Sequence, residues 1–258
     1  MILSDFHVHT RYCDGKNSPE EIIIEAISRG MKKLGFSGHS YTSFDEEPCM
    51  SVTGTERYKE EINALKEKYA SQIKIFCGTE QDYYSDFPAE GFDYIIGSVH
   101  YVLIDGEYIC VEHTDEIFTR LIHVCHDDVY EAAEKYFATV ADVVRKTNAD
   151  IIGHFDVITR LNRGSKFFDE NNPRYVAAWT SAIDELLKTG KPFEINMGGV
   201  ARGYKDFPYP SRPMLKYIAE HGGSVILSSD AHVKENLMYK FAEYEELALS
   251  MGLKVVEL

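Results

Sequence analysis

Short apolar runs alternate with longer amphipathic segments along the whole chain of 258 residues. The apolar runs are continuous and are bounded by turn residues, which is typical of strands buried on both faces. They predict strands at residues 2–6, 33–37, 73–77, 94–97, 150–152, 192–195 and 224–227.

The segments between these runs repeat apolar residues with the spacing of helices that bury one face. Ser18–Glu21 has the pattern of a capping box with proline at the first helical position, and Gly30 ends that helix. The pattern predicts helices at residues 18–30, 55–69, 128–146, 173–189, 211–221 and 234–251. Strand and helix in strict alternation indicate a parallel α/β sheet. Because no glycine-rich nucleotide-binding motif follows a strand, a barrel is favoured over a doubly wound sheet.

No linker rich in proline, serine or like charges divides the sequence, so we expect residues 1–258 to form one barrel domain. Two longer segments, residues 41–54 and 101–126, interrupt the alternation. We expect both to be active-site loops, since long ordered loops on a rigid barrel commonly carry function.

Composition narrows the classes of partner. The chain has 42 acidic and 27 basic residues, a net charge of −15, and no basic run, which argues against binding to nucleic acid or to an anionic membrane. The first residues carry no signal-peptide pattern, and the five cysteines lack any C-x-x-C pair. We therefore expect a cytoplasmic protein with reduced thiols, and oligomeric state stays open.

Polar residues of metal-ligand type follow the predicted strands. They are His7, His9, His39, Glu80, His100, His154, Asp230 and His232. In a parallel barrel the strand ends share one rim, where active sites are built, and the alternation of an extended strand points His7 and His9 to the same side. The other four histidines fall in predicted loops or helices and are expected on the surface: His113, His123, His126 and His221.

Each of these residues alone has a structural alternative, for instance Glu80 as a solvated carboxylate or Asp230 as a helix cap. Together on one rim they would lose hydration without compensation unless divalent cations lay among them. With Asp14, just past the first strand, they exceed the roughly four ligands that one zinc ion takes. Two or three ions are therefore predicted, and the mixed imidazole and carboxylate set suits Zn, Fe or Mn.

The same residues form a series of motifs that resembles the PHP (polymerase and histidinol phosphatase) superfamily. The motifs are His7-Val8-His9, Gly38-His39, Gly78-Thr79-Glu80, Gly97-Ser98-Val99-His100, Gly153-His154 and Ser229-Asp230-Ala231-His232. Residues 93–101, 152–156 and 194–196 are most similar to its histidinol-phosphate phosphatase branch.

The resemblance implies a distorted (β/α)7 TIM-like barrel with three metal ions. By position, the first ion would be held by His7, His9, Glu80 and Asp230; Glu80 would bridge to a second held by His100 and His154; Asp14, His39 and His232 would hold the third. Asp14 departs from the family, where histidine is frequent at that position.

The activity implied is hydrolysis of L-histidinol phosphate, a small phosphorylated substrate, by attack on phosphorus of a hydroxide bridging two ions. Asp230, His232 and Arg160 are the predicted catalytic residues. Arg160 and Arg202 are candidates for phosphate contacts, although arginines on loops are commonly solvated. Glu194 or Asn196 are candidates to accept hydrogen bonds from the substrate, with a purely structural role as the alternative.

The motifs leave other functions open. Another phosphoesterase of the same superfamily is possible on these motifs: a nucleotide phosphatase, a phosphotyrosine phosphatase or a nuclease. The charge of −15 argues against the nuclease. A catalytically silent metal-binding or regulatory module is disfavoured, because every motif position retains a residue type able to bind metal.

Overall fold

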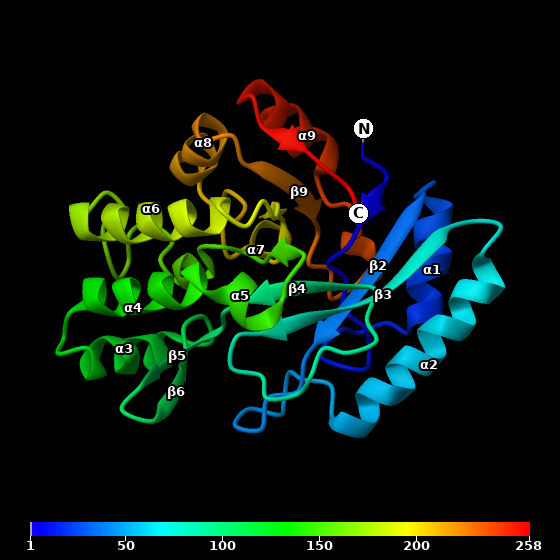
Figure 1. Cartoon of the computed structure of the whole chain (residues 1–258), viewed down its shortest axis with the longest axis horizontal. Helices are drawn as coiled ribbons and strands as arrows, with labels where there is room; N and C mark the ends of the chain where they lie inside the picture. The colour runs from blue at the N-terminus through cyan, green and yellow to red at the C-terminus, as the bar shows by residue number, and fades with distance from the viewer. Residues whose placement is uncertain (1) are drawn as a thin grey trace.

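Parallel strands form one curved sheet in the computed structural model, which describes residues 2–258 (Figure 1). The sheet order follows the chain: β1 (Ser4–Asp5), β2 (Lys33–His39), β3 (Lys74–Asp82), β4 (Tyr94–Ser98), β7 (Ile151–Ile152), β8 (Phe193–Asn196), β9 (Ser224–Ser228) and β10 (Lys254–Val255). All seven predicted strands are present. The predicted α/β class and distorted TIM-like barrel are confirmed, with β10 as an additional short strand.

The barrel closes at its carboxyl rim by a single bridge between Val8, beyond β1, and Ala231, beyond β9. The amide of His9 donates to the Ala231 carbonyl at 2.9 Å. Lower down, β9 pairs with β10 through Lys254 opposite Ser224. This change of partner distorts the barrel, and it brings the ends of β1 and β9 together where the polar residues lie.

Helices cover the outside of the sheet (Figure 1). They are α1 (Pro19–Ser28), α2 (Val52–Tyr69), α3 (Asp115–Val124), α4 (Val129–Ala141), α5 (Val143–Thr147), α6 (Pro173–Leu187), α7 (Gly198–Ala201), α8 (Arg212–Glu220) and α9 (Phe241–Ser250), with 3-10 turns η1 (Val157–Thr159) and η2 (Lys234–Asn236). The capping box that starts α1 is formed as predicted, since Ser18 and Glu21 exchange side-chain and backbone hydrogen bonds.

Two predicted helices differ from the structure. The helix expected over residues 128–146 is divided at Asp142, whose carboxylate accepts from Tyr83 Oη at 3.0 Å; aspartate favours such cap positions over a helix interior. The helix expected from residue 234 begins only at Phe241. Before it, the Met238 amide donates to the buried Asp5 side chain at 3.1 Å instead of to a helical carbonyl.

The segment at residues 101–126 has more structure than a loop. It contains a hairpin of β5 (Tyr101–Ile104) and β6 (Glu107–Cys110), followed by α3. The two strands of the hairpin are too short for their alternation of apolar and polar residues to be recognised in the sequence.

The barrel interior below the rim is apolar and aromatic. Phe6, Tyr94 and Ile226 pack there, with Val256 and Leu258 against them. The Tyr94 hydroxyl shares its hydrogen bond between the carbonyls of Phe6 and Phe36, and a Cβ on Gly35 or Gly78 would come within 2.4 Å of the Tyr94 side chain. Those two glycines therefore make room for the aromatic floor on which the polar rim rests.

The five cysteines form no disulfide. Within residues 2–258, a helix with the length and apolar character needed to cross a bilayer is not found.

Candidate metal centre and active site

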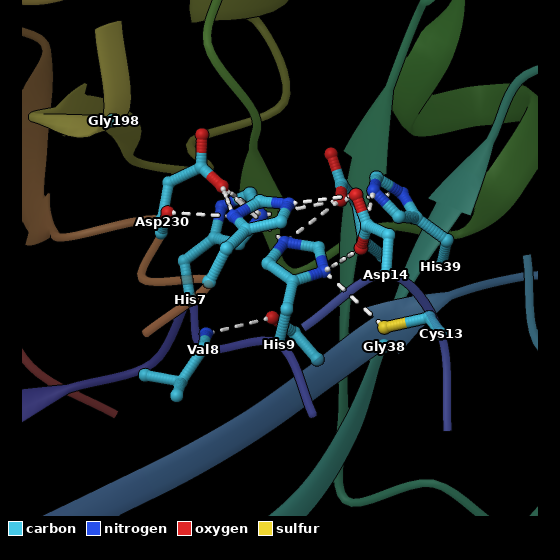
Figure 2. Close-up of polar contacts among 12 residues, drawn as sticks. His7, Val8, His9, Cys13, Asp14, Gly38, His39, Gly198 and Asp230 are labelled. Carbon is cyan, nitrogen blue, oxygen red and sulfur yellow. Dashed lines mark hydrogen bonds and ion pairs between the residues drawn. The ribbon is translucent and has the colours of Figure 1, made fainter. Parts of the chain in front are cut away.

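His7 and His9 lie just beyond β1 and point into the barrel mouth with Asp230, which follows β9 (Figure 2). His7 Nε2 is 3.2 Å from Glu80 Oε2 and 3.8 Å from Asp230 Oδ1. For His9 Nε2 the same two distances are 3.5 and 3.3 Å. Donors bound to one tetrahedral ion at about 2.1 Å lie about 3.4 Å apart. These four side chains therefore have the spacing of one shared ion.

Glu80 also reaches a second cluster through its other oxygen. Oε1 lies 2.8 Å from His154 Nε2 and 3.2 Å from His100 Nε2, and those two nitrogens are 3.2 Å apart. His39 Nδ1 approaches Glu80 Oε2 at 2.9 Å from the open side. The carboxylate thus occupies the bridging position that the sequence motifs imply.

Asp14 is the centre of a third cluster at the mouth. Its carboxylate is 3.0 Å from His232 Nε2, 3.7 Å from His39 Nε2 and 3.6 Å from His9 Nδ1. The four side chains offer ligand atoms within 4.8 Å of one another. His39 connects this cluster to the second, because its two ring nitrogens face Asp14 and Glu80.

The donors fit divalent cations on their chemistry as well as their spacing. His7 Nε2, His9 Nε2 and Glu80 Oε2 are buried and have no hydrogen-bond partner among the described residues. Buried polar atoms are rarely left unsatisfied, and converging nitrogens and carboxylate oxygens are ligands of zinc, iron and manganese. The site therefore suits the two or three ions expected from the sequence.

The surroundings of Glu80 and His9 set the protonation states of both side chains. Burial by itself would raise the pKa of Glu80, but the surrounding His39, His7 and His100 hold it well below its usual value. Burial, with His232 and His39 nearby, lowers the pKa of His9 to about 3, so this ring is neutral and able to bind a metal.

Glu194 and Asn196, on β8, lie beneath the site rather than in it. Both are fully buried and neither lines the cavity, so the substrate contact considered for them is not supported by their position. Glu194 Oε1 is 2.7 Å from His7 Nδ1, and its Oε2 accepts from the His154 amide at 2.9 Å and from Asn196 Nδ2 at 3.2 Å. This is the arrangement that orients a histidine ligand through its second nitrogen.

Asp82 has the corresponding relation to His100, with Oδ2 3.1 Å from the ring Nδ1. Asp82 was not predicted from the sequence to belong to the site. The signal was available, because Asp82 follows Glu80 by two positions on β3 and therefore shares its side of the strand.

A cavity of about 420 Å³ opens over the clusters. Both segments expected to be active-site loops contribute to its wall, with Thr42 and Asp45 from the first and Tyr101 and Glu112 from the second. His113, expected to be an ordinary surface residue, also lines it.

The two predicted arginines lie at this cavity in different settings. Arg202 Nη2 is 2.9 Å from Asp230 Oδ2, and Nη1 approaches His232 Nδ1 at 2.9 Å. A Cβ on Gly198 would meet that Asp230 oxygen at 2.3 Å, so only glycine leaves room for the pair. Arg160 pairs with Glu112 at 2.8 Å. Both guanidinium groups therefore line the cavity: Arg202 contacts Asp230 of the first cluster, and Arg160 contacts Glu112.

Lys16 and Glu112 also line the cavity. Lys16 was not selected from the sequence, where a single lysine in a loop carries no signal. Glu112 was covered only by the expectation that residues 101–126 form an active-site loop. The arginine beside Glu112 outweighs burial and lowers the pKa of this carboxyl, so it is anionic at the cavity wall.

Comparison with known proteins agrees with this geometry. The sequence profile described as "PHP domain" matches residues 5–198, so the chain belongs to the PHP domain family. Among curated relatives, the histidinol-phosphatase of Bacillus subtilis (strain 168) is 25% identical over 266 residues, covering 94% of this chain and 98% of the relative.

Two solved structures share the fold. The structure of a Listeria monocytogenes protein assigned as the histidinol phosphatase HisK has a TM-score of 0.81 at 17% identity, covering 93% of this chain and 99% of that one. The histidinol phosphate phosphatase of Lactococcus lactis, solved with zinc, L-histidinol and phosphate, has a TM-score of 0.71 at 21% identity, covering 98% and 95%.

Proposed function

We propose that this protein is a metal-dependent phosphatase that hydrolyses L-histidinol phosphate to L-histidinol and phosphate. The observation that carries the proposal is the meeting of three ligand clusters and two guanidinium groups at one small cavity. The name of the Bacillus subtilis relative and the molecules bound in the Lactococcus lactis structure support the choice of substrate.

Divalent ions, when bound, polarise phosphoryl oxygens and lower the pKa of water to about 7. His7, His9, Glu80 and Asp230 would hold the first ion; Glu80, His100 and His154 the second; and Asp14, His39 and His232 the third.

The two arginines of the cavity are the candidate phosphate-binding side chains. Arg160 and Arg202 would contact phosphate oxygens and stabilise the negative charge that grows on them in the transition state. Asp230 holds Arg202 in place while serving as a ligand, which couples the phosphate contact to the metal cluster.

The cationic amine and imidazole of histidinol need anionic partners. Glu112, Asp45 and Glu47 line the same cavity and supply carboxylates. We propose that they favour this substrate over phosphate esters that lack a cation, and that the enzyme works in the cytoplasm on small molecules rather than on nucleic acids.

The test is a phosphatase panel on protein loaded with Zn²⁺, Fe²⁺ or Mn²⁺. We expect kcat/KM for histidinol phosphate to exceed that for p-nitrophenyl phosphate, AMP and a phosphotyrosine peptide by at least about 100-fold, roughly the discrimination that a few charged contacts provide. A preference for AMP or phosphotyrosine would instead identify another phosphoesterase of the family.

Asp230→Asn should lower kcat by more than about 100-fold, as removal of a transition-state group does. Asp184→Asn, on the exposed side of α6, is the matched control and should leave activity unchanged. Full activity after exhaustive chelation would refute the metal-dependent chemistry itself.

A further inference from the structure

A second cavity, of about 410 Å³, lies outside the active site. Its walls are residues 162–171 after η1, one face of α6, and residues 205–213 before and at the start of α8. It has no lining residue in common with the first cavity. The proposed phosphatase activity makes no use of it.

Two buried polar atoms have no hydrogen-bond partner among the described residues: one belongs to a residue of the cavity wall and the other to a residue that contacts this wall. Tyr175 lines the cavity and is only 1% exposed, yet its hydroxyl is unpaired. Asp156 is fully buried beside it; Oδ2 accepts from the amide of Ser211, a lining residue, at 3.1 Å, while Oδ1 is unpaired. Buried hydroxyl and carboxyl groups usually have partners, so these atoms indicate that something polar binds here.

The cavity carries charges of both signs. Lys205 and Arg163 are cationic, and Glu170 and Asp206 are anionic. Lys205 Nζ donates to Thr159 Oγ1 at 2.8 Å, and Arg163 pairs with Asp206 at 2.6 Å at the exposed edge. Because Arg163 and Asp206 neutralise each other, Lys205 and Glu170 are the charges left to face a ligand, and Glu170 Oε1 also accepts from Asn162 Nδ2 at 3.0 Å. A zwitterion can pair with both of these side chains.

Aromatic side chains complete the wall: Tyr175, Trp179 and Phe207. Such surfaces bind flat apolar groups by stacking and edge contacts. The cavity therefore combines sites for a carboxylate, an ammonium group and a ring.

We propose that this second cavity binds a free aromatic α-amino acid. Its carboxylate would pair with Lys205, its ammonium group with Glu170 and the Tyr175 hydroxyl, and its ring would pack on Trp179 and Phe207. The site lies close to the catalytic one along the chain, because Thr159, which contacts Lys205, directly precedes Arg160. The inference does not depend on which phosphate ester is the substrate.

The experiment is calorimetric titration of the metal-loaded protein with L-phenylalanine, L-tyrosine, L-tryptophan and L-histidine, in saturating inorganic phosphate to occupy the active site. We expect saturable binding of at least one of them at one site per chain. Phenylacetate, which lacks the ammonium group, and phenethylamine, which lacks the carboxylate, should each bind at least tenfold more weakly than L-phenylalanine.

Variants locate the site. Tyr175→Phe and Lys205→Gln should each weaken binding at least tenfold, while the matched changes outside the cavity, Tyr69→Phe and Lys216→Gln, leave it unchanged. A thermal-shift measurement keeps the test independent of folding defects: Tyr175→Phe should keep the wild-type melting temperature without amino acid and lose the rise that the amino acid produces. Absence of binding by all four amino acids, or binding that both cavity variants leave intact, would overturn the proposal.

Discussion

Glu194 shows how one residue acquires its role from distant parts of the chain. It is 187 positions from His7, whose ring it contacts, and 40 positions from His154, whose amide donates a hydrogen bond to it. Both contacts restrain ligands of different candidate ions. A carboxylate considered for substrate binding is thereby better explained as a residue that positions metal ligands.

The variant Glu194→Gln tests this role. The amide group would place a donor where Glu194 now accepts from the His154 amide and Asn196, and would remove the charge that orients His7. Loss of such a contact typically costs 10–100-fold in metal affinity, and we expect a decrease of that size in a competition titration with a chelator. Glu243→Gln, on an exposed pair with Lys240, is the control. Unchanged affinity with a native circular-dichroism spectrum would argue against the assignment.

The hairpin β5–β6 lies between β4 and β7 in the chain and contributes Tyr101 and Cys110 to the wall of the active-site cavity. Tyr108 on β6 stacks on Phe44 of the facing loop, with ring centroids 3.9 Å apart, and Tyr101 Oη donates to Asp45 at 2.7 Å. These contacts join the two segments that wall the cavity. The hairpin therefore fixes one side of the space into which the substrate must fit.

Tyr108→Ala should loosen this wall without touching the candidate metal ligands. An aromatic pair contributes about 0.5–1.5 kcal/mol beyond its buried area, so we expect KM for the preferred substrate to rise about 2- to 10-fold with kcat and metal content little changed. Tyr69→Ala, at the end of α2 against Glu20, should change neither constant. A fall in kcat alone would mean that the hairpin acts on the chemistry instead.

At the scale of the whole molecule, the net negative charge of the chain and the cationic groups of the cavity have opposite effects on an anion. The chain carries a net charge of −15, yet Arg160, Arg202 and Lys16 all line the cavity that holds the ligand clusters. With divalent ions in the clusters, such a distribution would repel polyanions while the mouth admits a small phosphate ester.

Burial of Asp156 links the stability of the whole protein to pH. Desolvation raises its pKa to about 7 despite the attraction of Lys205, and Glu170 adds to the rise. Below about pH 4 both folded and unfolded states carry the proton. Between about pH 4 and pH 7 only the folded state keeps it, so stability falls as pH rises through this window and then levels off.

Asp156→Asn should remove this dependence. Relative to wild type, the variant should gain up to about 4 kcal/mol in free energy of unfolding between pH 4 and pH 8, from about 1.4 kcal/mol for each unit of pKa shift. Urea denaturation of both proteins across that range measures the difference, with Asp184→Asn as the control. A constant difference at all pH values would show that Asp156 is ionised in the folded protein.

Much of this molecule was determined by local sequence. Buried strands and amphipathic helices have periodicities that can be read from neighbouring residues, and in a parallel barrel the residue after each strand must come to the same rim. That is why all seven expected strands are present and why His7, Glu80 and Asp230, far apart in sequence, were expected together and lie together.

Tertiary structure alone decided which polar residues face the cavity and which support others from beneath. Glu194 carries the same chemistry as Glu80, and only its contact with His7 and its position away from the cavity lining separate the two roles. The division of the helix at Asp142 depends likewise on Tyr83, which packing brings near, and packing leaves the Tyr175 hydroxyl without a partner among the described residues. Periodicity specifies which face of an element is buried, but a hydrogen bond or ion site depends on distances of about 3 Å between segments that no local pattern encodes.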